Sequence, residues 1–124
     1  MAVSEDYLAF VLEQFSRVTP VTSRRMFGGV GLYADGVFFG VIDDNRVFLR
    51  TGPGNLAGYE AQGSAPFQPM GPNTKPMSYH ELPAGVLEDV ARLRLWLGKS
   101  LVEAAAAKKP TKPKRGRDGS ASRP

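Results

Sequence analysis

The residues that could carry chemistry are few in this sequence. The chain has one histidine, His80, followed by Glu81, and such a pair is a candidate for acid–base catalysis. Neighbouring residues of a strand point to opposite faces, so a strand here would separate the two side chains. A single histidine without any cysteine also leaves no ligand set for zinc. We therefore interpret His80 as a surface or edge histidine without a catalytic role.

The glycine-rich stretch FGGVG, residues 27–31, has only a superficial likeness to a phosphate-binding loop. A P-loop carries Lys-Ser or Lys-Thr after its glycines and leads into a helix, whereas an apolar run with Asp-Gly follows here. A dinucleotide site needs a βαβ unit, and the serines lie outside any nucleophile elbow. We therefore predict no enzyme activity, no cofactor and no metal.

The stretch Arg24-Arg25-Met26-Phe27 is a candidate docking site for a protein partner or a phosphate group. It sets the basic pair Arg24 and Arg25 beside two large apolar residues. The alternative is that Met26 and Phe27 belong to the core, as large apolar side chains usually do, with the arginines in solvent or in ion pairs.

The charge of the chain is divided unevenly. The segment from residue 108 onward has seven basic residues and one acidic residue, a net charge of +6, whereas the preceding part has nine basic and eleven acidic residues, a net charge of −2. A flexible cationic segment attracts nucleic acid by counterion release, without sequence specificity. The alternative is a solubilising tail without a dedicated partner. The first six basic positions of the tail are Lys108, Lys109, Lys112, Lys114, Arg115 and Arg117.

A length of 124 residues suits one domain with one core. We place that domain at residues 1–107 and a disordered basic tail at residues 108–124, where Pro, Lys, Gly and Ser cannot form a core. No apolar run reaches the roughly 20 residues that cross a bilayer, and the N-terminus has no apolar signal core. Together with the absence of cysteine, this predicts a cytoplasmic protein without membrane contact.

Helices are expected at both ends of the domain. The first spans residues 4–17, where Ser4 can cap the free amides and apolar residues recur at 3–4 spacing. The last begins after Leu82, with Pro83 suited to its first turn. Between them the sequence predicts a hairpin, a third strand over 46–50, a short helix over 55–61, a brief strand over 65–69 and a last strand within KPMSYHEL, residues 75–82.

The hairpin centres on Asp35-Gly36, a dipeptide typical of two-residue turns. Counting outward from this turn sets Gly31 opposite Gly40. We expect the two glycines to leave a notch without side chains, which another group fills. Gly36 supplies a positive φ in the turn, and Gly28-Gly29 marks a bend or bulge before the strand.

The same count predicts large apolar side chains on both faces of the sheet. One face would carry Val30, Leu32, Phe39 and Val41, and the other Tyr33, Phe38 and Ile42. A sheet with one face in water alternates apolar and polar residues more cleanly. Either both faces are covered within the chain, or one is covered by a partner, for example by a second copy in a homodimer.

These elements predict an α+β fold in two layers. An antiparallel meander sheet carries N- and C-terminal helices packed on it, in the order α-β-β-β-(short α)-β-β-α.

The pattern RRMFGG-x-G-x-Y-x-DG-x-x-FG, residues 24–40, is followed by FLR and later by SYHELP before a helix with a tryptophan. With these motifs the chain resembles the N-terminal domain of the TfoX/Sxy competence regulators, from Tyr7 to about Leu101. The matching positions are Arg25, Met26, Phe27, Gly28, Gly29, Gly31, Tyr33, Asp35, Gly36, Phe39, Gly40, Phe48, Leu49, Tyr79, Leu82 and Pro83.

The resemblance implies the same two-layer α+β fold and no known enzyme activity. Full-length relatives regulate natural competence as coactivators with a cyclic-AMP-responsive transcription factor, and they carry a separate C-terminal domain where this chain has a basic tail. We therefore expect a non-enzymatic regulatory or adaptor domain that contacts a protein partner, such as a transcription factor. The alternative is direct nucleic-acid binding without sequence specificity, mainly through the tail.

Overall fold

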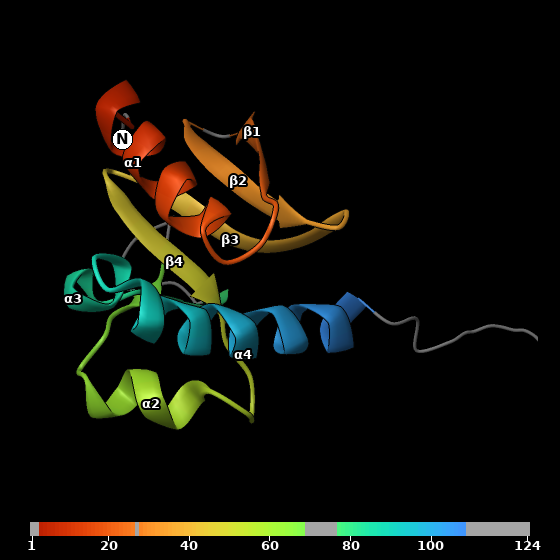
Figure 1. Cartoon of the computed structure of the whole chain (residues 1–124). Helices are drawn as coiled ribbons and strands as arrows, with labels where there is room; N and C mark the ends of the chain where they lie inside the picture. Colours follow the sequence, from red (N-terminus) through yellow and green to blue (C-terminus); the bar gives the residue numbers. More distant parts are fainter. Residues whose placement is uncertain (1–2, 27, 69–76, 109–124) are drawn as a thin grey trace, which may run out of the picture.

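The computed structural model describes residues 3–26, 28–68 and 77–108, and Figure 1 shows their arrangement. The strands are β1 (Thr22–Met26), β2 (Gly29–Ala34), β3 (Val37–Asp43), β4 (Arg46–Arg50), β5 (Pro66–Phe67) and β6 (Met77–Glu81). The helices are α1 (Glu5–Ser16), α2 (Leu56–Ala61), α3 (Ala84–Leu87) and α4 (Val90–Lys108).

The strands form one antiparallel sheet in the order β1-β2-β3-β4-β6-β5. Helices α1, α3 and α4 contribute to the core on one face of the sheet, and α2 lies beside α4 (Figure 1). The predicted two-layer α+β fold and the order of its elements are confirmed. The structure adds the strand β1 and divides the last helix in two.

The predicted basic tail lies outside the described residues, apart from Lys108, where α4 ends. Within the described ranges, none of the helices is both long enough and apolar enough to span a membrane.

Helix α1 begins where its capping residue predicts. The Ser4 hydroxyl accepts a hydrogen bond from the Tyr7 amide at 3.1 Å. The Ser4 amide donates to Asn45 Oδ1 at 2.9 Å, which ties the start of the helix to the turn between β3 and β4. Val11 and Phe15 from the apolar stripe are fully buried. The helix predicted over residues 4–17 is therefore confirmed.

Strand β1 was not expected from the sequence, because TSRRM lacks the alternation of apolar and polar residues that signals a strand. It is formed by its pairing with β2, in which Arg24 lies opposite Gly31 and Arg25 opposite Val30. The bend predicted at Gly28-Gly29 connects these two strands, and Gly28 has a φ of 81°.

The turn between β2 and β3 has the predicted geometry. Asp35 and Gly36 have φ values of 56° and 78°, which is the pattern of a two-residue hairpin turn with positive φ at both positions. The two residue pairs nearest the turn, Tyr33 with Phe38 and Ala34 with Val37, match the predicted register.

The prediction that Gly31 lies opposite Gly40 is wrong. Beyond Tyr33 the register shifts by one residue, so Gly40 pairs with Leu32 and Gly31 pairs with Val41. An extra residue in one strand of an antiparallel pair is a β-bulge, which local turn chemistry does not reveal.

Different side chains lie against Gly31 and Gly40, so the predicted shared notch does not form. A Cβ on Gly31 would lie 2.5 Å from Met26 Cε and 3.0 Å from Phe38 Cε1. A Cβ on Gly40 would lie 2.9 Å from Leu49 Cδ2. Each glycine is therefore already approached closely by side chains of the same chain.

The bulge moves the later residues of β3 to opposite faces of the sheet. Ile42, predicted on the face of Tyr33, lies in the core with Leu32 and Phe39, whereas Val41 leaves that face. The side chains on the second face form an outer cluster of Val41, Phe48, Phe67 and Tyr79, with Phe38 packed against it.

Large apolar side chains therefore line both faces, as predicted. The four members of the outer cluster are buried in the single chain. A homodimer stays a prediction.

A capping aspartate divides the last helix into α3 and α4. Asp89 Oδ1 accepts hydrogen bonds from the amides of Ala91 at 3.1 Å and Arg92 at 3.3 Å, which is the geometry of a helix N-cap. Leu93 and Leu97 on the following turns are fully buried. The apolar stripe of the sequence thus continues across a break that its periodicity does not show.

Two glycine substitutions test the packing of the sheet. In Gly29→Ala the added Cβ would lie 2.5 Å from the backbone oxygen of Ile42, so we expect the free energy of unfolding to fall by about 2 kcal/mol. Gly98 in α4 has no such neighbour within 4 Å, and Gly98→Ala should raise it by about 0.5–1 kcal/mol. Urea denaturation measures both, and an unchanged stability of Gly29→Ala would contradict the packing.

Candidate functional site

Strand β1 carries three of the four residues predicted to bind a partner. Arg24 and Arg25 are exposed and point to opposite faces, because neighbouring residues of a strand alternate. Met26 is half-buried and its side chain packs against Gly31. Phe27 lies outside the described residues. The arginines thus flank the edge of the sheet, whereas Met26 helps to pack the sheet.

The outward edge of β1 is open in the described part of the chain. β1 is the first strand of the sheet and pairs only with β2 there. Neither Arg24 nor Arg25 forms an ion pair with a described residue. An edge of this kind presents backbone donors and acceptors to any strand that approaches it.

The histidine and its neighbouring glutamate are separated, as strand geometry predicts. His80 Nδ1 lies 3.1 Å from Thr51 Oγ1, and burial lowers the pKa of His80 below its ordinary value of 6.5, while Glu60 opposes this shift. The Glu81 carboxylate accepts a hydrogen bond from Arg46 at 2.7 Å.

The position of His80 differs from the prediction of an edge histidine. β6 lies between β4 and β5 inside the sheet, and the side chain is half-buried. Among the described residues, no three His, Cys, Asp or Glu side chains gather as metal ligands would.

A polar junction joins the end of β4 to α2 and α4. Asn55 Oδ1 accepts a hydrogen bond from the Gly52 amide at 2.8 Å. Asn55 Nδ2 donates to Arg50 O at 3.0 Å and to Ser100 Oγ at 3.2 Å. The Ser100 hydroxyl donates to Arg50 O at 2.9 Å. Asn55 and Ser100 are both buried, so these bonds hold α2 at a fixed position relative to α4.

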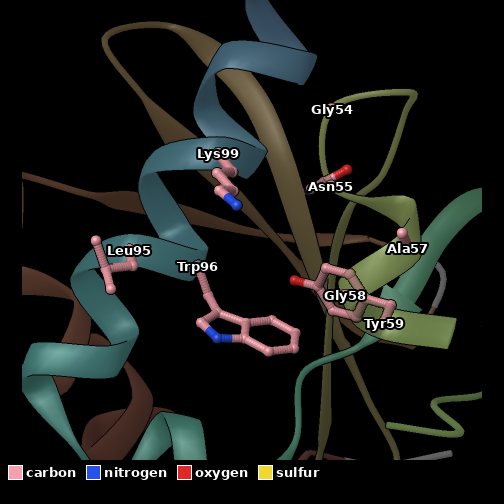
Figure 2. Close-up of a pocket in the computed structure, with 8 residues that line it drawn as sticks. All are labelled: Gly54, Asn55, Ala57, Gly58, Tyr59, Leu95, Trp96 and Lys99. Carbon is pink, nitrogen blue, oxygen red and sulfur yellow. The ribbon is translucent and has the colours of Figure 1, made fainter. Parts of the chain in front are cut away.

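A pocket of about 290 Å³ lies between α2 and α4 (Figure 2). The rings of Tyr59 and Trp96 form one side of it and meet edge to face, with centroids 4.7 Å apart and an interplanar angle of 80°. The other lining residues are Gly54, Asn55, Ala57, Gly58, Leu95 and Lys99. Small residues on the α2 side leave Trp96 partly accessible, whereas Tyr59 is buried.

The Tyr59 hydroxyl is the unusual polar group of this pocket. Tyr59 is only 1% exposed. Its hydroxyl is buried beside the Ser100 side chain and makes no well-formed hydrogen bond within the described residues. Burial raises the pKa of Tyr59 to about 12, and the nearby Ser100 side chain partly opposes this shift. The group is therefore protonated at neutral pH and can donate a hydrogen bond. Figure 2 shows it directed toward α4, between Trp96 and Lys99.

Two exposed side chains of α4 form the rim of the pocket. Leu95 is 67% exposed, and Lys99 is exposed without an ion pair to any residue in the described ranges. Lys99 is also the one cation among the lining residues. The pocket thus combines aromatic walls with a single positive charge.

This pocket was not predicted from the sequence. Trp96 fits the apolar stripe of the last helix, and Tyr59 lies in a short helix whose partner is unknown until the chain folds. The three-residue spacing from Trp96 to Lys99 does predict neighbouring positions on one helix face. That spacing is the one local signal that points to the site.

The sequence matches the model of the TfoX N-terminal domain family over residues 13–104. The chain belongs to the TfoX N-terminal domain family. No curated protein matches the chain. The matched span includes β1, the polar junction and the whole pocket between α2 and α4.

TfoX N-terminal domains form a regulatory family and not a known enzyme family. Membership supports a competence-related regulatory role in general. In this TfoX N-terminal domain, the open edge of β1 and the α2–α4 pocket are the two candidate sites.

Two substitutions distinguish the satisfied junction from the unsatisfied hydroxyl. Asn55→Ala leaves the Gly52 amide without its partner and removes one of the two donors to Arg50 O, so we expect the free energy of unfolding to fall by about 2 kcal/mol. Tyr59→Phe removes a buried hydroxyl that makes no well-formed hydrogen bond within the described residues, so stability should stay within about 0.5 kcal/mol or rise. Urea denaturation measures both. A loss of about 2 kcal/mol in Tyr59→Phe would show that the hydroxyl is bonded in the native state.

The single histidine allows a direct test of its environment. Because burial lowers its folded pKa below 6.5, the unfolded chain binds the proton more readily. The stabilising effect of neutral His80 is complete above pH 6.5 and is lost as the pH falls through the folded pKa. We expect its NMR ring signal to titrate below 6.5. Titration at or above that value would mean that the ring is not desolvated.

Proposed function

We propose that this domain is a non-enzymatic adaptor that acts by contact with a protein partner at β1. The observation that carries the proposal is the open edge of β1, flanked by Arg24 and Arg25. An extended segment of a partner can add to such an edge as a further strand, with backbone hydrogen bonds supplying affinity.

The charges of β1 favour an acidic segment. Arg24 and Arg25 point to opposite faces, so acidic side chains on either face of an added strand would lie near a positive charge. The same arginines oppose pairing between two copies of β1. An antiparallel pair over Thr22–Met26 would set Arg24 directly opposite Arg24 of the other copy, and like charges in that position are destabilising.

The regulatory family and the arrangement of the titratable groups support an adaptor over an enzyme. His80 is paired with Thr51, and Glu81 with Arg46, so neither is joined to the other as an acid–base pair. The resemblance to competence regulators makes a cyclic-AMP-responsive transcription factor the first partner to test.

The uneven charge of the chain supports a second function. The tail carries +6 against −2 for the preceding part, so it would attract DNA or RNA electrostatically and in a strongly salt-dependent manner. This contact would add to the adaptor function by holding the domain near nucleic acid, and it needs no structured site.

Charge reversal at β1 tests the adaptor proposal. We expect Arg24→Glu combined with Arg25→Glu to weaken binding to the purified cyclic-AMP-responsive transcription factor about tenfold, because two attractive charges become repulsive. Isothermal titration calorimetry on the full chain gives the affinity. Arg92→Glu, on the exposed side of α4, is the matched control and should bind as the unchanged chain does.

The same titrations separate the two functions. Full chains with Lys109→Gln, Lys112→Gln, Lys114→Gln and Arg115→Gln should keep the protein affinity and lose affinity for duplex DNA. Protein binding that is insensitive to both β1 arginines would contradict β1 as the docking site. DNA binding that is unchanged after the removal of these four positive charges would place the nucleic-acid contact on the domain.

A further inference from the structure

The pocket between α2 and α4 differs in kind from the open edge of β1. It is a concave site with fixed walls, because the Asn55–Ser100 junction holds its two helices together. Its volume of about 290 Å³ lies at the lower end of the range for small-molecule sites. The size suits a single ring with a short side arm.

The walls of the pocket favour a flat, apolar body. Trp96 is half-buried and presents aromatic surface to the pocket, and Leu95 adds an exposed apolar side chain at the rim. Gly58 lies opposite the Trp96 ring, where an added Cβ would be 4.0 Å from Trp96 Cη2. Aromatic rings pack against such surfaces in offset or edge-to-face geometry.

The polar groups of the pocket favour one singly charged anion. Lys99 supplies an ammonium group without an ion pair among the described residues. The Tyr59 hydroxyl is buried beside Ser100, so Lys99 is the polar group that a ligand can reach. The donors of Asn55 are already used inside the fold.

A doubly charged phosphate would find too few donors and a carboxylate nearby. The Glu103 carboxylate accepts a hydrogen bond from the amide of Gly54, a lining residue. The charge of Glu103 would repel a dianion more strongly than a monoanion.

We propose that this pocket binds a small aromatic carboxylate. Its ring lies against Trp96 beside Gly58, and its carboxylate pairs with the Lys99 ammonium. The exposed lysine thereby gains a counter-ion. The ligand site is independent of the protein contact at β1.

The position of the tryptophan makes the test direct. Trp96 is the single tryptophan of the chain, so its fluorescence reports on the pocket alone. We expect 3-phenylpropionate to change the Trp96 emission of the full chain saturably, with a Kd of about 0.1–1 mM for so small a ligand. The neutral amide of the same acid should bind about fivefold more weakly or worse, because it loses the charge interaction with Lys99.

Three variants test which residues of the pocket contribute to the affinity for the ligand. Lys99→Met keeps most of the aliphatic stem and should reduce the preference for acid over amide to less than about twofold. Gly58→Leu should remove saturable binding by filling the space before Trp96, while its helix propensity preserves the fold. Arg92→Met removes a cation from α4 outside the pocket and should leave the affinity unchanged. Circular dichroism and thermal unfolding of each variant verify that it is folded.

Three results would overturn the proposal. The first is that neither probe changes the Trp96 emission saturably at concentrations up to about 10 mM. The second is equal affinity for the acid and the amide in the unchanged chain. The third is a Gly58→Leu variant that is folded and binds normally, which would place the ligand outside the pocket.

Discussion

The register shift between β2 and β3 is the constraint on which the rest of the structure depends. It occurs at Gly40, which pairs with Leu32, whereas a regular hairpin would pair it with Gly31. Because side chains alternate along a strand, a shift of one residue exchanges the two faces beyond it. Ile42 therefore enters the core, and Val41 joins Phe48 in the outer cluster.

This exchange gives each face of the sheet its own layer of apolar side chains. On the inner face, the core of the sheet receives Leu93 and Leu97 of α4, which are fully buried, so the axis of α4 is fixed against β3 and β4. The Asn55–Ser100 junction then sets α2 beside α4 and leaves a pocket between them. The open edge of β1 lies at one end of the same sheet, so one fold presents two sites of different chemistry.

The sequence predicted those features that depend on local chemistry. The cap at Ser4 and the Asp35-Gly36 turn are decided by a few neighbouring residues, and both are as expected. The bulge is not visible in this way, because both registers pair apolar residues with apolar residues. β1 has no apolar alternation and exists through its pairing with β2. The pocket brings together Tyr59 and Trp96 from different helices, so no local pattern contains it.

The bulge can be tested by the NMR contacts between the backbone protons of β2 and β3. We expect cross-strand contacts from Leu32 to Gly40 and from Gly31 to Val41, as the observed register requires. Contacts from Gly31 to Gly40 and from Val30 to Val41 would show a regular hairpin instead. That result would exchange the faces of Val41 and Ile42 and contradict the core on which α4 packs.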